Sequence, residues 1–158
     1  MPNWCMNEVS IHGEEQEVTK FVDECFTEVD NQQVLDFDKV LPEPDYNKPQ
    51  NVDKDSTTAS VTTALLSQGG IGKGWQPDWY KWRLANWGTK WNLVPAKGGD
   101  VEGYTIDIMK DSVLLSFDTA WSPPDGIYDA IGDKYPDLSV SWFYREDGMQ
   151  MSGWLPYD

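Results

Sequence analysis

The stretch Tyr104–Trp121, with the sequence YTIDIMKDSVLLSFDTAW, decides the fold that we expect for this chain. Its side chains alternate on both sides of a central turn, Lys110–Ser112. A period of two is typical of a strand with one buried face. Two such runs joined by a short polar turn predict an antiparallel β-hairpin. The alternating set is Tyr104, Ile106 and Ile108 before the turn and Val113, Leu115, Phe117, Thr119 and Trp121 after it.

A strand and a helix are expected before this hairpin. Residues Trp4–His12 place apolar side chains on one side of a strand, in a row that Asn7 interrupts. Residues 14–29 then carry apolar side chains at the i, i+3, i+4, i+7, i+8 and i+11 positions of an amphipathic helix. The N-terminal part is therefore predicted as one strand followed by one helix.

A helix and two strands are expected after the hairpin. Pro123 suits the first turn of a helix that ends at Pro136. The two strands, Leu138–Arg145 and Met149–Leu155, are joined by the turn at residues 146–148.

The middle of the chain is less regular. Residues 30–56 contain three closely spaced prolines and are predicted as a loop, apart from a short alternating piece at residues 34–40. Residues 57–67 favour a helix only slightly, and the glycine-rich residues 68–74 are expected to act as a hinge. A further helix is predicted after Pro77, with its C-terminal cap at Gly88.

With residues 30–100 treated as an insertion, the element order is β-α-β-β-α-β plus one strand. This order predicts a single domain over residues 1–158 of the α+β class, a ferredoxin-like antiparallel sheet with a Trp-rich inserted helical segment and an extra C-terminal strand. A length of 158 residues suits one such domain.

Composition excludes several classes of partner. The net charge of −15 argues against direct binding of nucleic acid or of an anionic membrane. No run of about 18 apolar residues and no signal peptide is found, so we expect a protein of the host-cell cytoplasm. Cys5 and Cys25 lie on apolar faces and are expected to be buried free thiols.

One segment departs from this acidic character. Residues 70–99 carry five basic side chains against Asp78 alone, a net charge of +4, which leaves −19 for the remainder. Five of the nine tryptophans lie between Trp75 and Trp91. Indole faces stack on planar groups, and Lys and Arg bind phosphate or carboxylate, so this segment predicts a site for a planar anionic ligand.

No catalytic arrangement is found in the sequence. His12 is the only histidine, and neither cysteine lies in a CxxC pair, which argues against a His triad and a zinc ribbon. The glycine-rich residues 69–74 lack the hydroxyl of a phosphate-binding loop, although a backbone nest with Lys73 stays open. We expect no enzyme activity, no metal and no cofactor.

Three pieces of the chain resemble the signatures of the ferredoxin-like, YubB-like proteins of enterobacterial plasmids and phages. They are Pro2-Asn3-Trp4 with Asn7, then Asn86-Trp87-Gly88-Thr89-Lys90-Trp91, and finally Phe117–Pro124. The resemblance implies the fold and an origin in a mobile element, and it implies no reaction.

The three signatures are expected to converge. In a ferredoxin-like sheet the first strand lies beside the strand that ends at Trp121, and the insertion can lay residues 86–91 over the open sheet face. The candidate ligand-binding residues are Trp4, Asn7, Lys81, Arg83, Asn86, Trp87, Lys90, Trp91, Asp118, Thr119 and Trp121. Two interpretations stay open: a pocket with aromatic walls, or a second hydrophobic core in which Trp87, Trp91 and Trp121 seal the insertion to the sheet. Asp118 either accepts hydrogen bonds from a ligand or faces water.

The leading hypothesis is a non-catalytic binding protein of a phage or plasmid that sequesters a nucleotide-like molecule used as a host defence signal. The alternative is an acidic nucleic-acid mimic that inhibits a host defence protein complex, of the anti-CRISPR or anti-restriction type. The sequence leaves open whether the chain forms a homo-oligomer.

Overall fold

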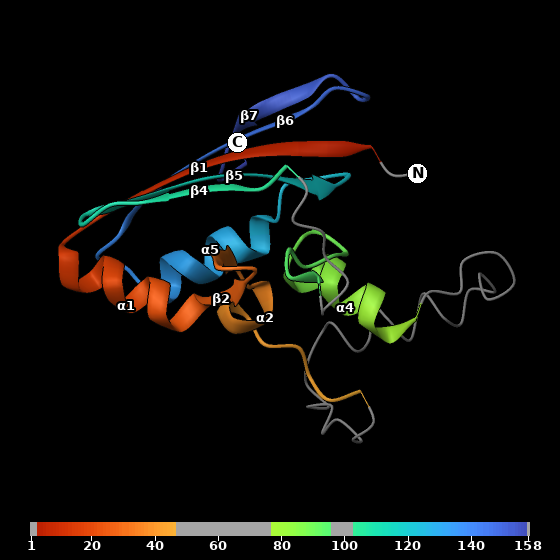
Figure 1. Cartoon of the computed structure of the whole chain (residues 1–158). Helices are drawn as coiled ribbons and strands as arrows, with labels where there is room; N and C mark the ends of the chain where they lie inside the picture. Colours follow the sequence, from red (N-terminus) through yellow and green to blue (C-terminus); the bar gives the residue numbers. More distant parts are fainter. Residues whose placement is uncertain (1–2, 47–76, 96–102, 158) are drawn as a thin grey trace, which may run out of the picture.

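A five-stranded antiparallel sheet forms the frame of the molecule. The computed structural model describes residues 3–46, 77–95 and 103–157, and Figure 1 shows their arrangement. The strand order is β4-β5-β1-β6-β7. The strands are β1 (Trp4–His12), β4 (Thr105–Ile108), β5 (Ser112–Ala120), β6 (Ser139–Glu146) and β7 (Met151–Trp154).

β1 lies at the centre of this sheet. It pairs with β5 along its whole length, from Trp4 opposite Ala120 to His12 opposite Ser112, and with β6 on its other side. The predicted hairpin is confirmed as β4 and β5, and β7 adds the extra C-terminal strand at the opposite edge. This central placement of the first strand is the ferredoxin-like arrangement predicted from the element order.

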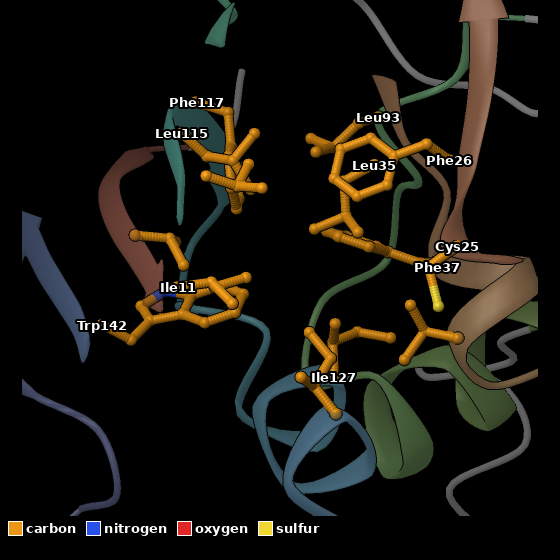
Figure 2. Close-up of a cluster of buried hydrophobic side chains, with 14 of the residues drawn as sticks. Ile11, Cys25, Phe26, Leu35, Phe37, Leu93, Leu115, Phe117, Ile127 and Trp142 are labelled. Carbon is orange, nitrogen blue, oxygen red and sulfur yellow. The ribbon is translucent and has the colours of Figure 1, made fainter. Parts of the chain in front are cut away.

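Helices cover one face of the sheet. α1 (Glu15–Cys25), α2 (Phe37–Val40) and α5 (Asp125–Lys134) lie below the sheet in the view of Figure 1. Figure 2 shows the core between the two layers, where sheet residues face residues of the helical layer across a shared apolar space. Fully buried members include Ile11, Phe21, Phe37, Phe117, Ile127 and Trp142. The apolar faces of the strands, which have a period of two, and of α1, which has a period of 3.6, therefore pack together in one core.

The helix predicted over residues 14–29 is too long. It ends at Cys25, and the next residues form a second hairpin of β2 (Phe26–Val29) and β3 (Gln32–Leu35). Asp30 and Asn31 form its turn with φ angles of 51° and 64°. Two successive positive φ values are typical of a type I′ hairpin turn, and short Asx side chains tolerate them better than other non-glycine residues.

The loop predicted over residues 30–56 is also wrong at residues 32–33, and the alternating piece at residues 34–40 that the prediction excepted holds the end of β3 and then α2. Asp36 begins α2 because its carboxylate accepts a hydrogen bond from the backbone N–H of Asp38. Val34, Leu35, Phe37 and Val40 are buried in the main core, so this part of the expected insertion is built into the domain.

The remaining middle predictions have mixed outcomes. The helix expected after Pro77 is confirmed as α4 (Asp78–Asn86), and Gly88 follows it with a φ of 88°. The predictions for residues 47–56, 57–67 and 68–74 lie outside the described residues. Cys5 and Cys25 are buried free thiols, as predicted.

Candidate functional site

Two of the sequence signatures are joined directly to each other. The Ser122 hydroxyl donates to the Gly88 carbonyl at 2.7 Å, and the Thr89 hydroxyl donates to the Ala120 carbonyl at 3.2 Å. The backbone N–H of Gly126 donates to the Trp87 carbonyl at 3.1 Å. The second and third signatures therefore meet, as expected, and these contacts fix residues 87–89 against the end of β5.

Trp121 stands at this junction in an unusual backbone conformation. Its φ is 71°, and its side chain is 44% exposed. Its N–H donates to the Asn3 carbonyl at 2.8 Å, and the Thr119 hydroxyl closes the same turn by donating to the Ser122 carbonyl at 2.7 Å. A left-handed conformation is uncommon for a bulky residue and is often found where a side chain is positioned for function.

Two indoles and one ammonium group lie together beside the strand end that this turn follows. Trp4 is 46% exposed, and its ring lies 5.9 Å from the half-buried ring of Trp91. The Lys90 ammonium lies 4.3 Å from the centre of the Trp91 ring. Trp121 follows Ala120, the residue that pairs with Trp4 across the sheet. We call Trp4, Lys90, Trp91 and Trp121 the tryptophan corner.

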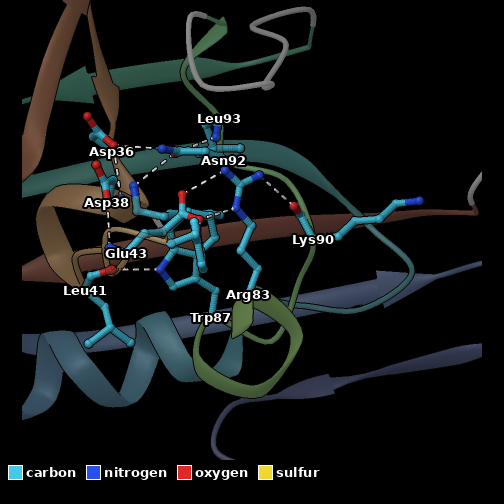
Figure 3. A network of polar contacts seen from close by, with 11 residues as sticks. Asp36, Asp38, Leu41, Glu43, Arg83, Trp87, Lys90, Asn92 and Leu93 are labelled. Carbon is cyan, nitrogen blue, oxygen red and sulfur yellow. Dashed lines mark hydrogen bonds and ion pairs between the residues drawn. The ribbon is translucent and has the colours of Figure 1, made fainter. Parts of the chain in front are cut away.

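The sequence predicts that Trp87 lies over the open sheet face, and this prediction is wrong. Its side chain is fully buried on the helix-covered side, where its ring contacts Phe37 and Trp82 edge to face. Its indole N–H donates to the Leu41 carbonyl at 2.9 Å, as Figure 3 shows. For this residue the packed-core interpretation holds, because no face of the ring is left for a ligand.

Arg83 is occupied by an internal partner. Its Nε and Nη2 donate to the two carboxylate oxygens of Glu43 at 3.0 and 2.8 Å, and Nη1 donates to the Lys90 carbonyl at 3.0 Å (Figure 3). The two charged side chains are only 13% and 15% exposed. A forked pair of this kind holds both partners in place, so the cation predicted to meet a phosphate ties α4 to Glu43 instead.

Asn7 and Thr119 are buried polar residues within the sheet. The Asn7 amide donates to the Thr119 hydroxyl at 2.9 Å, and its oxygen accepts from the Trp142 indole at 3.0 Å. Asn86 is half-buried, and its amide donates to the Trp82 carbonyl at 2.8 Å. These three predicted polar residues make hydrogen bonds that stabilise the fold.

Asp118 and Lys81 remain at the surface. Asp118 is exposed on β5, opposite Met6, and partial burial raises the pKa of its carboxyl above the ordinary value. Lys81 is half-buried on α4. Both stay accessible, and their predicted contact with a ligand stays a prediction.

The sheet face that no described helix covers carries a second candidate surface, and none of the residues that line its hollow was predicted as a site residue. A hollow of about 410 Å³ lies across this face, lined by side chains of all five strands. The lining residues that point outward are Glu8, Ser10, Thr105, Asp107, Leu114, Ser116, Ser141, Phe143 and Trp154. The signal was present in the second set of each strand's alternation, which places Phe143 and Trp154 on the outward side together with Glu8.

None of the described helices is long and apolar enough to cross a membrane. Among the residues that the structure describes, no group of three or more His, Cys, Asp or Glu side chains is placed to hold a metal ion.

Comparison with known proteins supports the fold. Residues 100–158 match a family model described as the ferredoxin-like domain in Api92-like protein. The matched part contains β4, β5, α5, β6 and β7 and covers less than half of the chain. No curated protein and no solved structure matches the chain. The match supports a ferredoxin-like fold for residues 100–158 and assigns no reaction or ligand.

Proposed function

We propose that this chain is a non-catalytic binding protein that captures a planar anionic small molecule of nucleotide type at the tryptophan corner. The proposal includes an origin in a phage or plasmid, a relation to YubB-like proteins and a place in the host cytoplasm. In that setting, capture of a host defence signal needs affinity and slow release, and no chemical step.

The neighbouring side chains of Trp4, Lys90 and Trp91, at the strand end that Trp121 follows, carry this proposal. Trp4 and Trp121 keep nearly half of their surface exposed, and the Lys90 ammonium sits at the face of Trp91. A base stacked on Trp4 brings its phosphates within reach of Lys90, the half-buried cation of the corner. The backbone hydrogen bonds around Trp121 hold the backbone of this turn in place before a ligand arrives, which reduces the entropy cost of binding.

Isothermal titration against a panel of linear and cyclic nucleotides tests the proposal. We expect at least one nucleotide to bind. The substitutions Trp121→Ala and Lys90→Ala should each lower the affinity for this nucleotide by about tenfold. Trp154→Ala and Lys110→Ala are the matched controls, because they remove an exposed indole and an exposed cation that lie outside the corner. An absence of heat with every nucleotide contradicts the proposal, and recovery of a chemically altered ligand contradicts its non-catalytic part.

A further inference from the structure

A ladder of five side chains crosses the open sheet face and combines carboxylate, hydroxyl and aromatic groups. The strand register places Glu8 of β1 between Ser116 of β5 and Phe143 of β6. Phe143 in turn faces Trp154 of β7, and Thr105 of β4 completes the ladder beside Ser116. Facing residues in adjacent strands have Cβ atoms about 5 Å apart, so Glu8, Phe143 and Trp154 lie within reach of one bound group.

The aromatic end of the ladder is exposed. Trp154 is 62% exposed, and its ring lies 5.2 Å from the half-buried ring of Phe143 at a tilt of 60°. Leu114, on the neighbouring row beside Ser10, is 39% exposed. Large apolar side chains gathered in one hollow of a sheet face are typical of an interaction surface.

The polar part of the hollow is negative. Glu8 and Asp107 line it, and neither side chain makes a hydrogen bond or an ion pair within the described residues. Arg145 lies on the same face, but its Nε is already 3.0 Å from a carboxylate oxygen of Asp147. The two carboxylates of the hollow therefore face solvent without a described countercharge.

This chemistry selects among the possible occupants. Phosphates of a nucleic acid are repelled by Glu8 and Asp107, and a second copy of this acidic chain is repelled by its own charge of −15. A guanidinium group satisfies both parts of the ladder, since it stacks flat on an aromatic ring and donates two hydrogen bonds to a carboxylate. The hollow also extends over all five strands, which is wider than one guanidinium group needs.

We propose that this open face docks a basic segment of a partner protein, with an arginine side chain held between Glu8 and the Phe143–Trp154 pair. The remaining basic residues of the segment lie toward Asp107, and hydroxyls of the neighbouring strands bind its backbone. The net charge of −15 attracts such a segment from a distance. The site lies about 13 Å along β1 from Trp4, at 3.3 Å per residue, and the inference does not rest on the proposed function.

The experiment uses the full chain and an eight-residue peptide of alternating glycine and arginine that carries a fluorescent label. We expect fluorescence anisotropy to show binding that is several-fold tighter than that of the matching glycine–lysine peptide. Glu8→Gln and Trp154→Ala should each lower the affinity for the arginine peptide by about tenfold. Glu28→Gln removes the same charge from exposed Glu28 on β2, and Trp121→Ala removes an exposed indole at the tryptophan corner, so neither should have this effect.

Three outcomes overturn the proposal. An equal loss of affinity for the arginine peptide with Glu8→Gln and Glu28→Gln indicates that the peptide is attracted by the overall acidic charge of the protein. Methylguanidinium that binds as tightly as the peptide indicates a small-molecule site. A dimer in sedimentation that Trp154→Ala dissociates indicates that a second copy covers this face. Circular dichroism of each variant excludes loss of folding, and nucleotide titration of Glu8→Gln shows separately whether the tryptophan corner binds its own ligand.

Discussion

The indole N–H of Trp142 donates a hydrogen bond of 3.0 Å to the side-chain oxygen of Asn7 in the middle of the sheet. Both side chains are fully buried, and they come from adjacent strands that are 135 residues apart in sequence. Asn7 also donates to Thr119, so one amide links β6, β1 and β5 on the helix-covered face. A buried amide with both of its ends satisfied fixes the register of three strands.

Asn7→Leu should therefore lower the free energy of unfolding by about 1–3 kcal/mol, because the Trp142 N–H is left buried without its acceptor. Urea denaturation followed by circular dichroism measures the change. Glu8→Ala, one residue along the same strand but exposed on the opposite face, should change the stability by less than about 0.5 kcal/mol. Equal effects of the two substitutions would contradict a structural role for the Asn7 amide.

Two glycines of α5 should respond to alanine in opposite directions. A Cβ at Gly126 would lie 1.7 Å from the Asn86 carbonyl oxygen, so Gly126→Ala must push apart the α4–α5 contact and should cost several kcal/mol. A Cβ at Gly132 meets nothing within 4 Å, so Gly132→Ala should raise the stability by about 0.5–1 kcal/mol. Thermal denaturation of the two variants checks both signs.

The ion pair of Arg83 and Glu43 should contribute more to the free energy of unfolding than a surface ion pair does. Its two parallel hydrogen bonds are mostly shielded from solvent, and Arg83→Ala should cost about 2 kcal/mol. A double-mutant cycle with Glu43→Gln measures the coupling between the two side chains. Arg83→Lys should restore only part of the loss, because an ammonium group lacks the forked geometry. Additive single effects would show that the contact does not stabilise the fold.

Stability should fall in alkaline solution because of Cys5. Burial raises the pKa of the Cys5 thiol from 9.0 to about 11. The unfolded chain releases this proton at the lower pH, so the free energy of unfolding decreases between about pH 9 and pH 11 and is unaffected by Cys5 below this range. Cys5→Ala should reduce this pH dependence relative to the unmodified chain. Urea denaturation at pH 7, 9 and 10 compares the two proteins, and parallel curves would contradict the prediction.

Period and turn chemistry explain which parts of the fold were predictable. The hairpin of β4 and β5 has clear alternation on both sides of its turn, and α1 has an unbroken apolar stripe up to Cys25. Beyond Cys25 the apolar residues Phe26 and Val29 also fit the helical spacing, so the pattern alone could not end the helix. The ending comes from Asp30 and Asn31, a type I′ turn pair that is a weaker signal than the usual Asn-Gly.

The candidate site was less predictable because its residues depend on distant partners. The location of Trp87 is set by packing against Phe37 and by the Leu41 carbonyl, and the state of Arg83 is set by Glu43 forty residues earlier. No local sequence pattern predicts either contact. Lys90 and Trp91, which the signature had singled out, are half-buried and keep part of their surface accessible.

The central position of β1 also determines when the domain is able to fold during its synthesis. β1 is complete at His12, but its two partners begin at Ser112 and Ser139, so at about 5–20 residues per second the ribosome needs on the order of 5–25 s to supply both. Until then the apolar side of β1 has no sheet to join, while the local hairpin of β2 and β3 has both of its strands early. The sheet therefore closes only after β6 has been made, and nascent chains that stall before residue 139 should be the ones that chaperones and proteases encounter unfolded.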